Sequence, residues 1–273
     1  AADNAIVTVK DLNFAGEHSG VYAGVYVRNY NKYTTKFENV NIVNKADGSG
    51  IDIIIRPNTK NETVHIPVVI NASGLNDLVY NDFFIGDDAD ILIVAGCGIH
   101  NCGNQDSEHD GIHRFYIGKN AKIKYVEKHY GAGDGKGNRV MNPTTIIEIE
   151  DGGYMEMDTV QIKGVDSTNR VTKAKLKNDA TLVIKEKIMT HGTQFAETNF
   201  EVDLDGENSG TNVISRSVAK DNSRQIFRSC INGNNRCTGH FFKGRNNLLT
   251  HIFARKVDVE CLSRIRQIGT RTL

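Results

Sequence analysis

The chain alternates between apolar and polar residues with a period of two over most of its length. Short alternating runs of the kind typical of β-strands include Ile51–Ile55, Ile123–Val126, Met155–Met157 and Leu182–Ile184. Asn, Asp and Gly separate these runs. Helix-compatible residues occur in two places only. One is Asn76–Ile85, which we interpret as a helix or a turn-rich connection, and the other is the segment after Val257. We therefore expect an all-β protein with little helix.

The turns between these runs recur at a regular spacing. Four of them each precede a strand and end in a small residue: Gly86–Ala89, Gly118–Ala121, Glu150–Gly153 and Lys177–Ala180. Their last residues are 32, 32 and 27 positions apart. A turn, a small residue and a strand repeated at this period predict a β-solenoid, with the small residues at corners where coils stack about 4.8 Å apart. A two-sheet sandwich joined by hairpins is the alternative.

Composition and charge restrict the possible partners. The 273 residues are 39% hydrophobic and 24% charged, as in a folded protein, with 33 basic and 33 acidic residues. This balance gives no bias toward nucleic acid or anionic membrane, so we expect neither as a partner. The longest apolar run, Ile91–Ile99, is far shorter than the roughly 20 residues of a membrane-spanning helix.

The charge is nevertheless unevenly distributed along the chain. Residues 236–273 contain 8 basic and 2 acidic residues, a net charge of +6. We expect one β-helix domain over residues 1–258, followed by a divergent basic tail over residues 259–273.

The cysteines suggest a reducing compartment. There are 5 of them, an odd number that leaves at least one thiol unpaired within the chain. The sequence opens with neither an initiator Met nor a basic-then-apolar leader. We expect a cytoplasmic protein rather than a secreted one, and a chain that begins inside a longer product.

The densest group of reactive side chains lies in the first half of the chain. Cys97, His100, Cys102, His109 and His113 fall within 17 residues, and soft sulfur with imidazole suits zinc, iron or an iron–sulfur cluster. These five residues are the candidate metal ligands. On a strand, Cys97 and His100 would face opposite sides, so a shared site would need a kink at the neighbouring glycines. The alternative is a buried Cys97 that ends its strand and histidines in a polar loop.

A second pair of candidate ligands lies near the end of the chain. Cys237 and His240 are three residues apart, and Cys230, seven residues before Cys237, is assigned to packing. The glycines of 131–137 match neither a Walker loop nor a dinucleotide-binding fingerprint, so they indicate a surface loop.

Three stretches of the chain resemble the core of the SufB/SufD family of iron–sulfur cluster assembly proteins. They are Gly118–His129, Met155–Thr168 and Ser215–Lys220, and the likeness is clearest over residues 84–240. The resemblance implies a right-handed parallel β-helix. It also implies an assembly scaffold of the SUF system rather than an enzyme, one that accepts sulfur and iron and passes on a transient iron–sulfur cluster.

The resemblance further implies partners and residue roles. Two subunits would pair, as a homodimer or a SufB/SufD-type heterodimer, through residues 225–250, and a SufC-like ABC ATPase would dock on each. Cys97 would be the sulfur acceptor, and Cys97, Cys237 and His240 would bind the cluster. After Asp258 the chain departs from the family's ATPase-binding helical segment, which leaves that docking an open expectation.

Two other classes of function stay open from the residues. One is a secreted-type β-helix enzyme that acts on polysaccharides. The other is a metal-dependent hydrolase that would use Cys97, His100, Cys102 and His113 around one ion.

Overall fold

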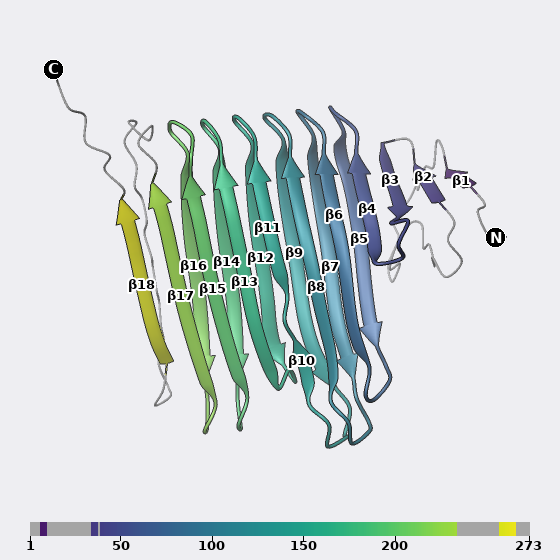
Figure 1. Ribbon diagram of the computed structural model, residues 1–273, viewed down its shortest axis with the longest axis vertical. Coiled ribbons are helices and arrows are strands. Elements are labelled where there is room, and N and C mark those ends of the chain that lie inside the picture. Colours follow the sequence, from purple (N-terminus) through teal and green to yellow (C-terminus); the bar gives the residue numbers. More distant parts are fainter. Residues whose placement is uncertain (1–5, 10–33, 38, 234–256, 266–273) are drawn as a thin grey trace, which may run out of the picture.

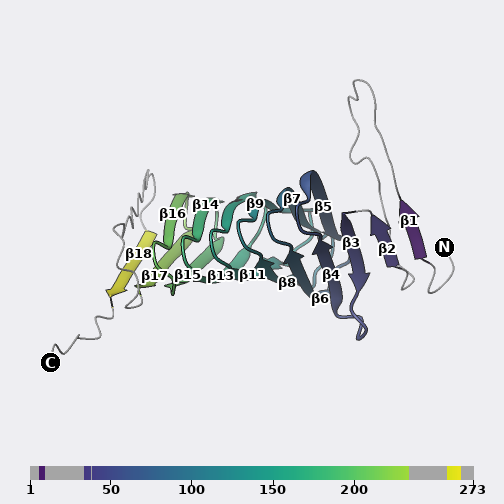
Figure 2. The same cartoon turned by 90° about the horizontal axis from the view of Figure 1, so that it is seen from above.

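The chain folds into two parallel β-sheets that face each other and are joined by tight corners (Figures 1 and 2). The computed structural model describes residues 6–9, 34–37, 39–233 and 257–265, with side chains over residues 39–233. Within these residues there is no helix, as the alternating sequence predicts. None of the described residues forms a helix long and apolar enough to cross a membrane.

Sheet A forms one wall of the molecule and has the strand order β1-β2-β3-β4-β6-β8-β10-β13-β15-β17-β18, with β11 following β10 between β8 and β13. Its strands are β1 (Ile6–Val9), β2 (Thr34–Phe37), β3 (Val40–Asn44), β4 (Gly50–Ile55), β6 (Asn76–Ile85), β8 (Ser107–Ile117), β10 (Arg139–Met141), β11 (Thr144–Ile149), β13 (Ser167–Leu176), β15 (Phe195–Leu204), β17 (Arg224–Gly233) and β18 (Val257–Ile265).

Sheet B forms the opposite wall and has the strand order β16-β14-β12-β9-β7-β5. Its strands are β5 (Lys60–Ile70), β7 (Asp90–His100), β9 (Lys122–Ala132), β12 (Tyr154–Lys163), β14 (Thr181–Thr190) and β16 (Gly210–Ala219). From β4 to β17 the chain passes back and forth between the two sheets, with β10 and β11 sharing one pass, and each strand pairs in parallel with a strand of a neighbouring coil. This is a parallel β-solenoid and excludes the hairpin sandwich; only β3 pairs in antiparallel fashion among the described strands, with β2 and β4.

The corners lie where the repeat predicts them. Ala89, Ala121, Gly153 and Ala180 are all buried, and each amide donates to the carbonyl three residues earlier. The residue before each has a positive φ and is Asp, Asn or Gly, which tolerate the left-handed conformation. Each corner carbonyl also accepts a hydrogen bond from the amide at the start of the strand in the next coil. For example, the Lys122 amide donates to the Ala89 carbonyl at 2.7 Å. Small residues at these positions fit the close stacking of successive coils.

The bore, meaning the space between the inner faces of sheets A and B, changes character along the strands. Next to the small-residue corners it is filled by aliphatic, aromatic and methionine side chains, with Phe83 and Phe115 stacked at 4.3 Å between ring centroids. Toward the other end of the same strands the inner positions become polar and include Glu127, Arg170 and Glu186, all buried. The apolar half supplies the core, and the polar half contains the candidate site.

Two sequence expectations of helix are wrong. Residues 76–85 form strand β6, and residues 257–265 form strand β18. In β6 the inward positions include Asp77 and Asn81 as well as Phe83 and Ile85, so polar residues conceal the period of two. β18 pairs along its length with β17, and the expected domain boundary after residue 258 falls inside it.

Candidate functional site in the bore

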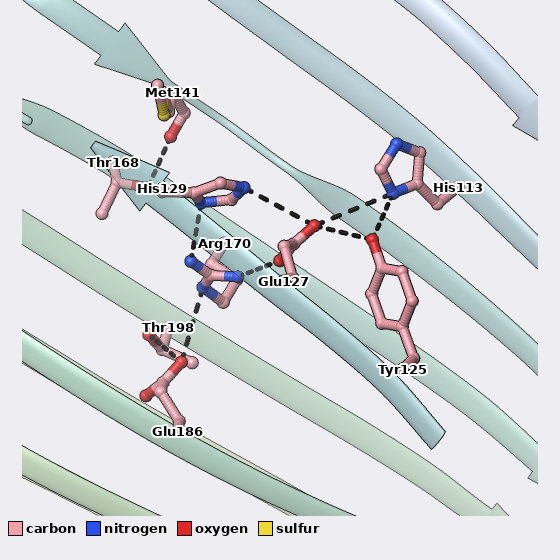
Figure 3. Close-up of polar contacts among 9 residues, drawn as sticks. All are labelled: His113, Tyr125, Glu127, His129, Met141, Thr168, Arg170, Glu186 and Thr198. Atoms are coloured by element: carbon pink, nitrogen blue, oxygen red, sulfur yellow. Dashed lines mark hydrogen bonds and ion pairs between the residues drawn. The ribbon is translucent and has the colours of Figure 1, made fainter. Parts of the chain in front are cut away.

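Arg170 is the centre of a buried network of charged and polar side chains (Figure 3). Its side chain extends from the inner face of β13 and is only 2% exposed. One terminal nitrogen donates to Glu127 Oε2 at 2.8 Å, and the other donates to His129 Nδ1 at 3.0 Å. Its Nε lies 3.5 Å from Glu186 Oε2. One guanidinium therefore faces two carboxylates and an imidazole, all shielded from water.

Glu127 and Glu186 are held in different electrostatic states by their surroundings. Burial by itself would raise the pKa of Glu127, but His129 and the positive charge of Arg170 outweigh burial and hold that pKa well below its usual range. For Glu186 burial dominates, and its pKa is raised despite Arg170 and hydrogen bonds from Ser215 and Thr198. The network therefore pairs one firmly ionised carboxylate with one that takes up a proton more readily.

Two histidines have proton positions set by their neighbours. The guanidinium of Arg170 can only donate, so His129 accepts at Nδ1 and carries its proton on Nε2, which faces Glu127 at 3.5 Å. The Tyr125 hydroxyl donates to Glu127 at 3.0 Å, so it accepts from His113 Nδ1, also at 3.0 Å. Burial lowers the pKa of His113 to about 4. His113 is therefore neutral, with the lone pair on Nε2.

Cys97 lies on the inner face of β7, beside His129 of the next coil in sheet register. It is 3% exposed and packs with Ile70, Ile99 and Met141. Burial, and then the negative charge of Glu127, raise the pKa of the Cys97 thiol. The side chain is therefore a neutral thiol in a second, smaller apolar cluster of the bore, separate from the core next to the corners.

The five predicted metal ligands separate into two groups. Cys97, His109 and His113 face the bore and are buried, whereas His100 and Cys102 are exposed on the outside. The two exposed side chains contact each other, with His100 Nε2 3.1 Å from Cys102 Sγ. The opposite orientation of Cys97 and His100 follows from strand alternation, as the sequence predicts.

These five side chains do not surround one point. Within the described residues, no three His, Cys, Asp or Glu side chains are arranged to hold a metal ion. The single-ion arrangement that the hydrolase hypothesis requires is therefore not found there. Cys237 and His240 lie outside the described residues. The three cysteines whose side chains are described, Cys97, Cys102 and Cys230, form no disulfide, and Cys230 is half-buried on β17.

The charged centre of the site was missed by sequence reasoning, although its signal is present. In β9, Glu127 points to the same face of the strand as Ile123 and Tyr125. In β13, Arg170 points to the same face as Ala174 and Leu176. A charged residue at an inward position of a strand indicates a buried, paired charge. That signal can be recognised only once it is known which residues of each strand point into the bore.

The fold and the bore define a class: a parallel β-solenoid with a thiol and a paired-charge network enclosed between its sheets. The family model described as the SufBD core domain of the SUF system for FeS cluster assembly matches residues 78–249, more than half of the chain. The chain therefore belongs to the SufBD family, which confirms the resemblance noted from its motifs.

Two curated archaeal relatives give the same result at modest identity. An iron–sulfur cluster assembly SufBD family protein of Methanocaldococcus jannaschii is 27% identical over 172 residues, which cover 63% of this chain and 53% of the relative. One of Archaeoglobus fulgidus is 25% identical over 142 residues, which cover 52% of this chain and 37% of the relative. The matched part of the chain thus spans about half or less of each relative.

Proposed function

We propose that this chain is a scaffold subunit of iron–sulfur cluster assembly that accepts sulfur and iron and passes on a transient cluster. The observation that carries the proposal is the SufBD core match over the coils that enclose Cys97 and the Arg170 network. The family is described by cluster assembly rather than by turnover of a small molecule, so the proposed role is that of an assembly component and not of an enzyme.

Cys97 is the proposed sulfur acceptor. A thiol in the bore would hold a persulfide away from water and exogenous reductants, which favours storage of a labile sulfur atom. Loading follows thiol–disulfide chemistry: the Cys97 thiolate attacks the outer sulfur of a donor persulfide, the donor thiolate leaves, and the S–S bond now joins Cys97 to that sulfur. Since burial raises the pKa of Cys97, the reaction requires a transient opening that hydrates the thiol.

Sulfur loading of defined variants tests this proposal. The purified chain is incubated with a persulfide donor, such as a cysteine desulfurase with cysteine, and the mass increase of one sulfur atom on each cysteine is measured by peptide mass spectrometry. We expect Cys97→Ser to remove most of the protein-bound sulfur and Cys230→Ser to leave it unchanged. Equal effects of the two substitutions would remove the reason for assigning the role to Cys97.

Partners and location are part of the same proposal. We infer a homodimer or a SufB/SufD-type heterodimer, a SufC-like ABC ATPase as a further partner, and a cytoplasmic location. Because β18 pairs with β17, the last described strand of sheet A is β18, and the last described strand of sheet B is β16. Exposed strand edges favour pairing with another chain. Light scattering at micromolar concentration tests the pairing, and a monomer there would contradict it.

Cluster ligation is proposed for Cys97 together with Cys237 and His240, with iron supplied from solution. Thiolate and imidazole are the ligands that iron–sulfur clusters use in proteins. The metal ligands proposed from the sequence, Cys97, His100, Cys102, His109 and His113, divide between the bore and the outer surface. We therefore treat the outer pair His100–Cys102 as a separate surface contact rather than as part of one centre.

A further inference from the structure

The inner face of β8 carries two histidines separated by a glycine, in the order His109, Gly111, His113. All three positions point into the bore because they alternate along the strand, and both imidazoles are buried. Gly111 has no side chain, so a small space remains between the two rings. A methyl group at Gly111 would lie 3.4 Å from Nε2 of His109 and 3.2 Å from Nε2 of His113. The Nε2 atoms of both rings therefore border the same space.

The other nitrogen of each ring is held by a fixed partner. Nδ1 of His109 donates to Oδ2 of Asp77 at 2.7 Å, from the adjacent position of β6. Nδ1 of His113 donates to the Tyr125 hydroxyl, which itself donates to Glu127, and Figure 3 shows the second nitrogen of His113 directed away from both. Because Nδ1 of each ring is engaged in these hydrogen bonds, Nε2 is the atom of each ring that faces the space above Gly111.

Nε2 of His109 has no protein partner among the described residues. Its side chain is 4% exposed, and Nε2 is buried without a hydrogen bond. An orphaned buried nitrogen is costly, and such atoms require an explanation in a native structure. An imidazole whose Nδ1–H is bonded to a carboxylate while its Nε2 is free has the arrangement typical of a metal-ligating histidine, since the carboxylate fixes the ring and strengthens the ligand.

We propose that His109 and His113 bind one divalent transition-metal ion of the borderline class, such as Fe²⁺, Zn²⁺ or Co²⁺, through their Nε2 atoms above Gly111. Imidazole nitrogen is a preferred ligand of these ions. Asp77 and Glu127, behind the two rings, supply negative charge that offsets that of the ion. Two ligands leave positions open for water or a small anion, so the site holds an ion that can be released.

The location of the site gives the ion a route in. Asp77 is 37% exposed, so His109 is one side chain away from solvent at the end of the bore. The site is distinct from the proposed sulfur acceptor Cys97 and does not depend on the proposed role in cluster assembly. Coordination involves no redox step.

Cobalt binding by the full chain tests the site, with equilibrium dialysis for affinity and X-ray absorption for the ligand type. The wild-type chain should bind Co²⁺ with imidazole scattering at two nitrogens. Gly111→Ala keeps every ligand but fills the space with a methyl group, and it should weaken this binding at least tenfold. His109→Ala should do the same. Asp77→Asn, at the partly exposed rim, should weaken it about 10- to 100-fold through loss of the orienting carboxylate.

Two controls make the result decisive. His65→Ala removes an exposed histidine of β5 and should leave Co²⁺ affinity unchanged. Circular dichroism establishes that each variant is folded. If Gly111→Ala or His109→Ala does not fold, the Co²⁺ affinity of Asp77→Asn is compared with that of the wild type instead. Affinity that is unchanged by Gly111→Ala and by Asp77→Asn in folded protein overturns the site. If the chain binds Co²⁺ as expected but accepts no sulfur from a persulfide donor, the proposed function is contradicted and the metal site is still supported.

Discussion

Replacing Arg170 by Met tests whether the buried network is held by the guanidinium. Met has similar length and no charge, so the substitution removes the cation with little change in volume. It leaves Glu127 without its 2.8 Å partner and Glu186 without its nearest positive charge. Breaking a buried ion pair by removal of one partner costs about 3–5 kcal/mol, because the remaining charge is left uncompensated. We expect a loss of stability in that range.

The matched control is on the same strand. Lys173 of β13 points outward, is 60% exposed and pairs with Glu201 at 3.4 Å. A surface ion pair contributes about 0–1 kcal/mol, so Lys173→Met should change stability by no more than that. Urea unfolding followed by circular dichroism gives both values; the chain has no tryptophan to serve as a fluorescent reporter.

A double substitution separates charge from packing. When Arg170→Met is combined with Glu127→Gln, the ionised carboxylate is removed together with its cation, and the introduced amide oxygen can still accept from Tyr125. We expect this pair to be less destabilised than Arg170→Met alone, which is a favourable coupling in a double-mutant cycle. The reasoning is refuted if Arg170→Met costs no more than Lys173→Met, or if the second substitution adds its full effect to the first.

Three further outcomes follow from the same geometry. His113 has a folded-state pKa of about 4 against 6.5 when unfolded, so between these values only the unfolded chain takes up its proton. Wild-type stability should therefore fall by up to about 3 kcal/mol relative to His113→Gln as pH drops from 7 to 4, measured by urea unfolding. Ile93→Ala, in the apolar half of the bore, should cost about 2–5 kcal/mol in the same assay, and a loss below 1 kcal/mol would contradict tight packing there. A thiol reagent should label exposed Cys102 in the folded chain much faster than buried Cys97, which becomes accessible only by transient opening or unfolding; equal labelling rates would contradict the burial of Cys97.

Most of the architecture can be predicted from the sequence, because each corner of the solenoid accepts only a few residue types. A left-handed turn position favours Asn, Asp or Gly, and close stacking of coils favours Ala or Gly directly after it. These requirements recur at Asp88–Ala89, Asn120–Ala121 and Asp179–Ala180. The same position in the coils before and after these carries Thr59 and Ser209, which are small but polar, so the repeat extends beyond the four turns that the pattern identifies.

The interior of the site is harder to predict, because it depends on which residues meet across the bore. Arg170 and Glu127 are 43 residues apart, and nothing in either strand specifies the partner on the facing sheet. Cys97 and His100 are close in sequence, yet alternation sends them to opposite faces. Local density of ligand-type residues therefore pointed to a segment that contributes Cys97, His109 and His113 to the bore, without resolving which side chains lie together.

Anaerobic reconstitution with ferrous iron and sulfide tests the central claim, that this SufBD family chain assembles iron–sulfur clusters. After removal of unbound iron and sulfide, the account predicts broad visible absorption that stays with the protein, iron and acid-labile sulfide in comparable amounts, and loss of most of this absorption in Cys97→Ser but not in Cys230→Ser. A chain that stays colourless under these conditions, or that binds stoichiometric zinc and no sulfide, would contradict the claim.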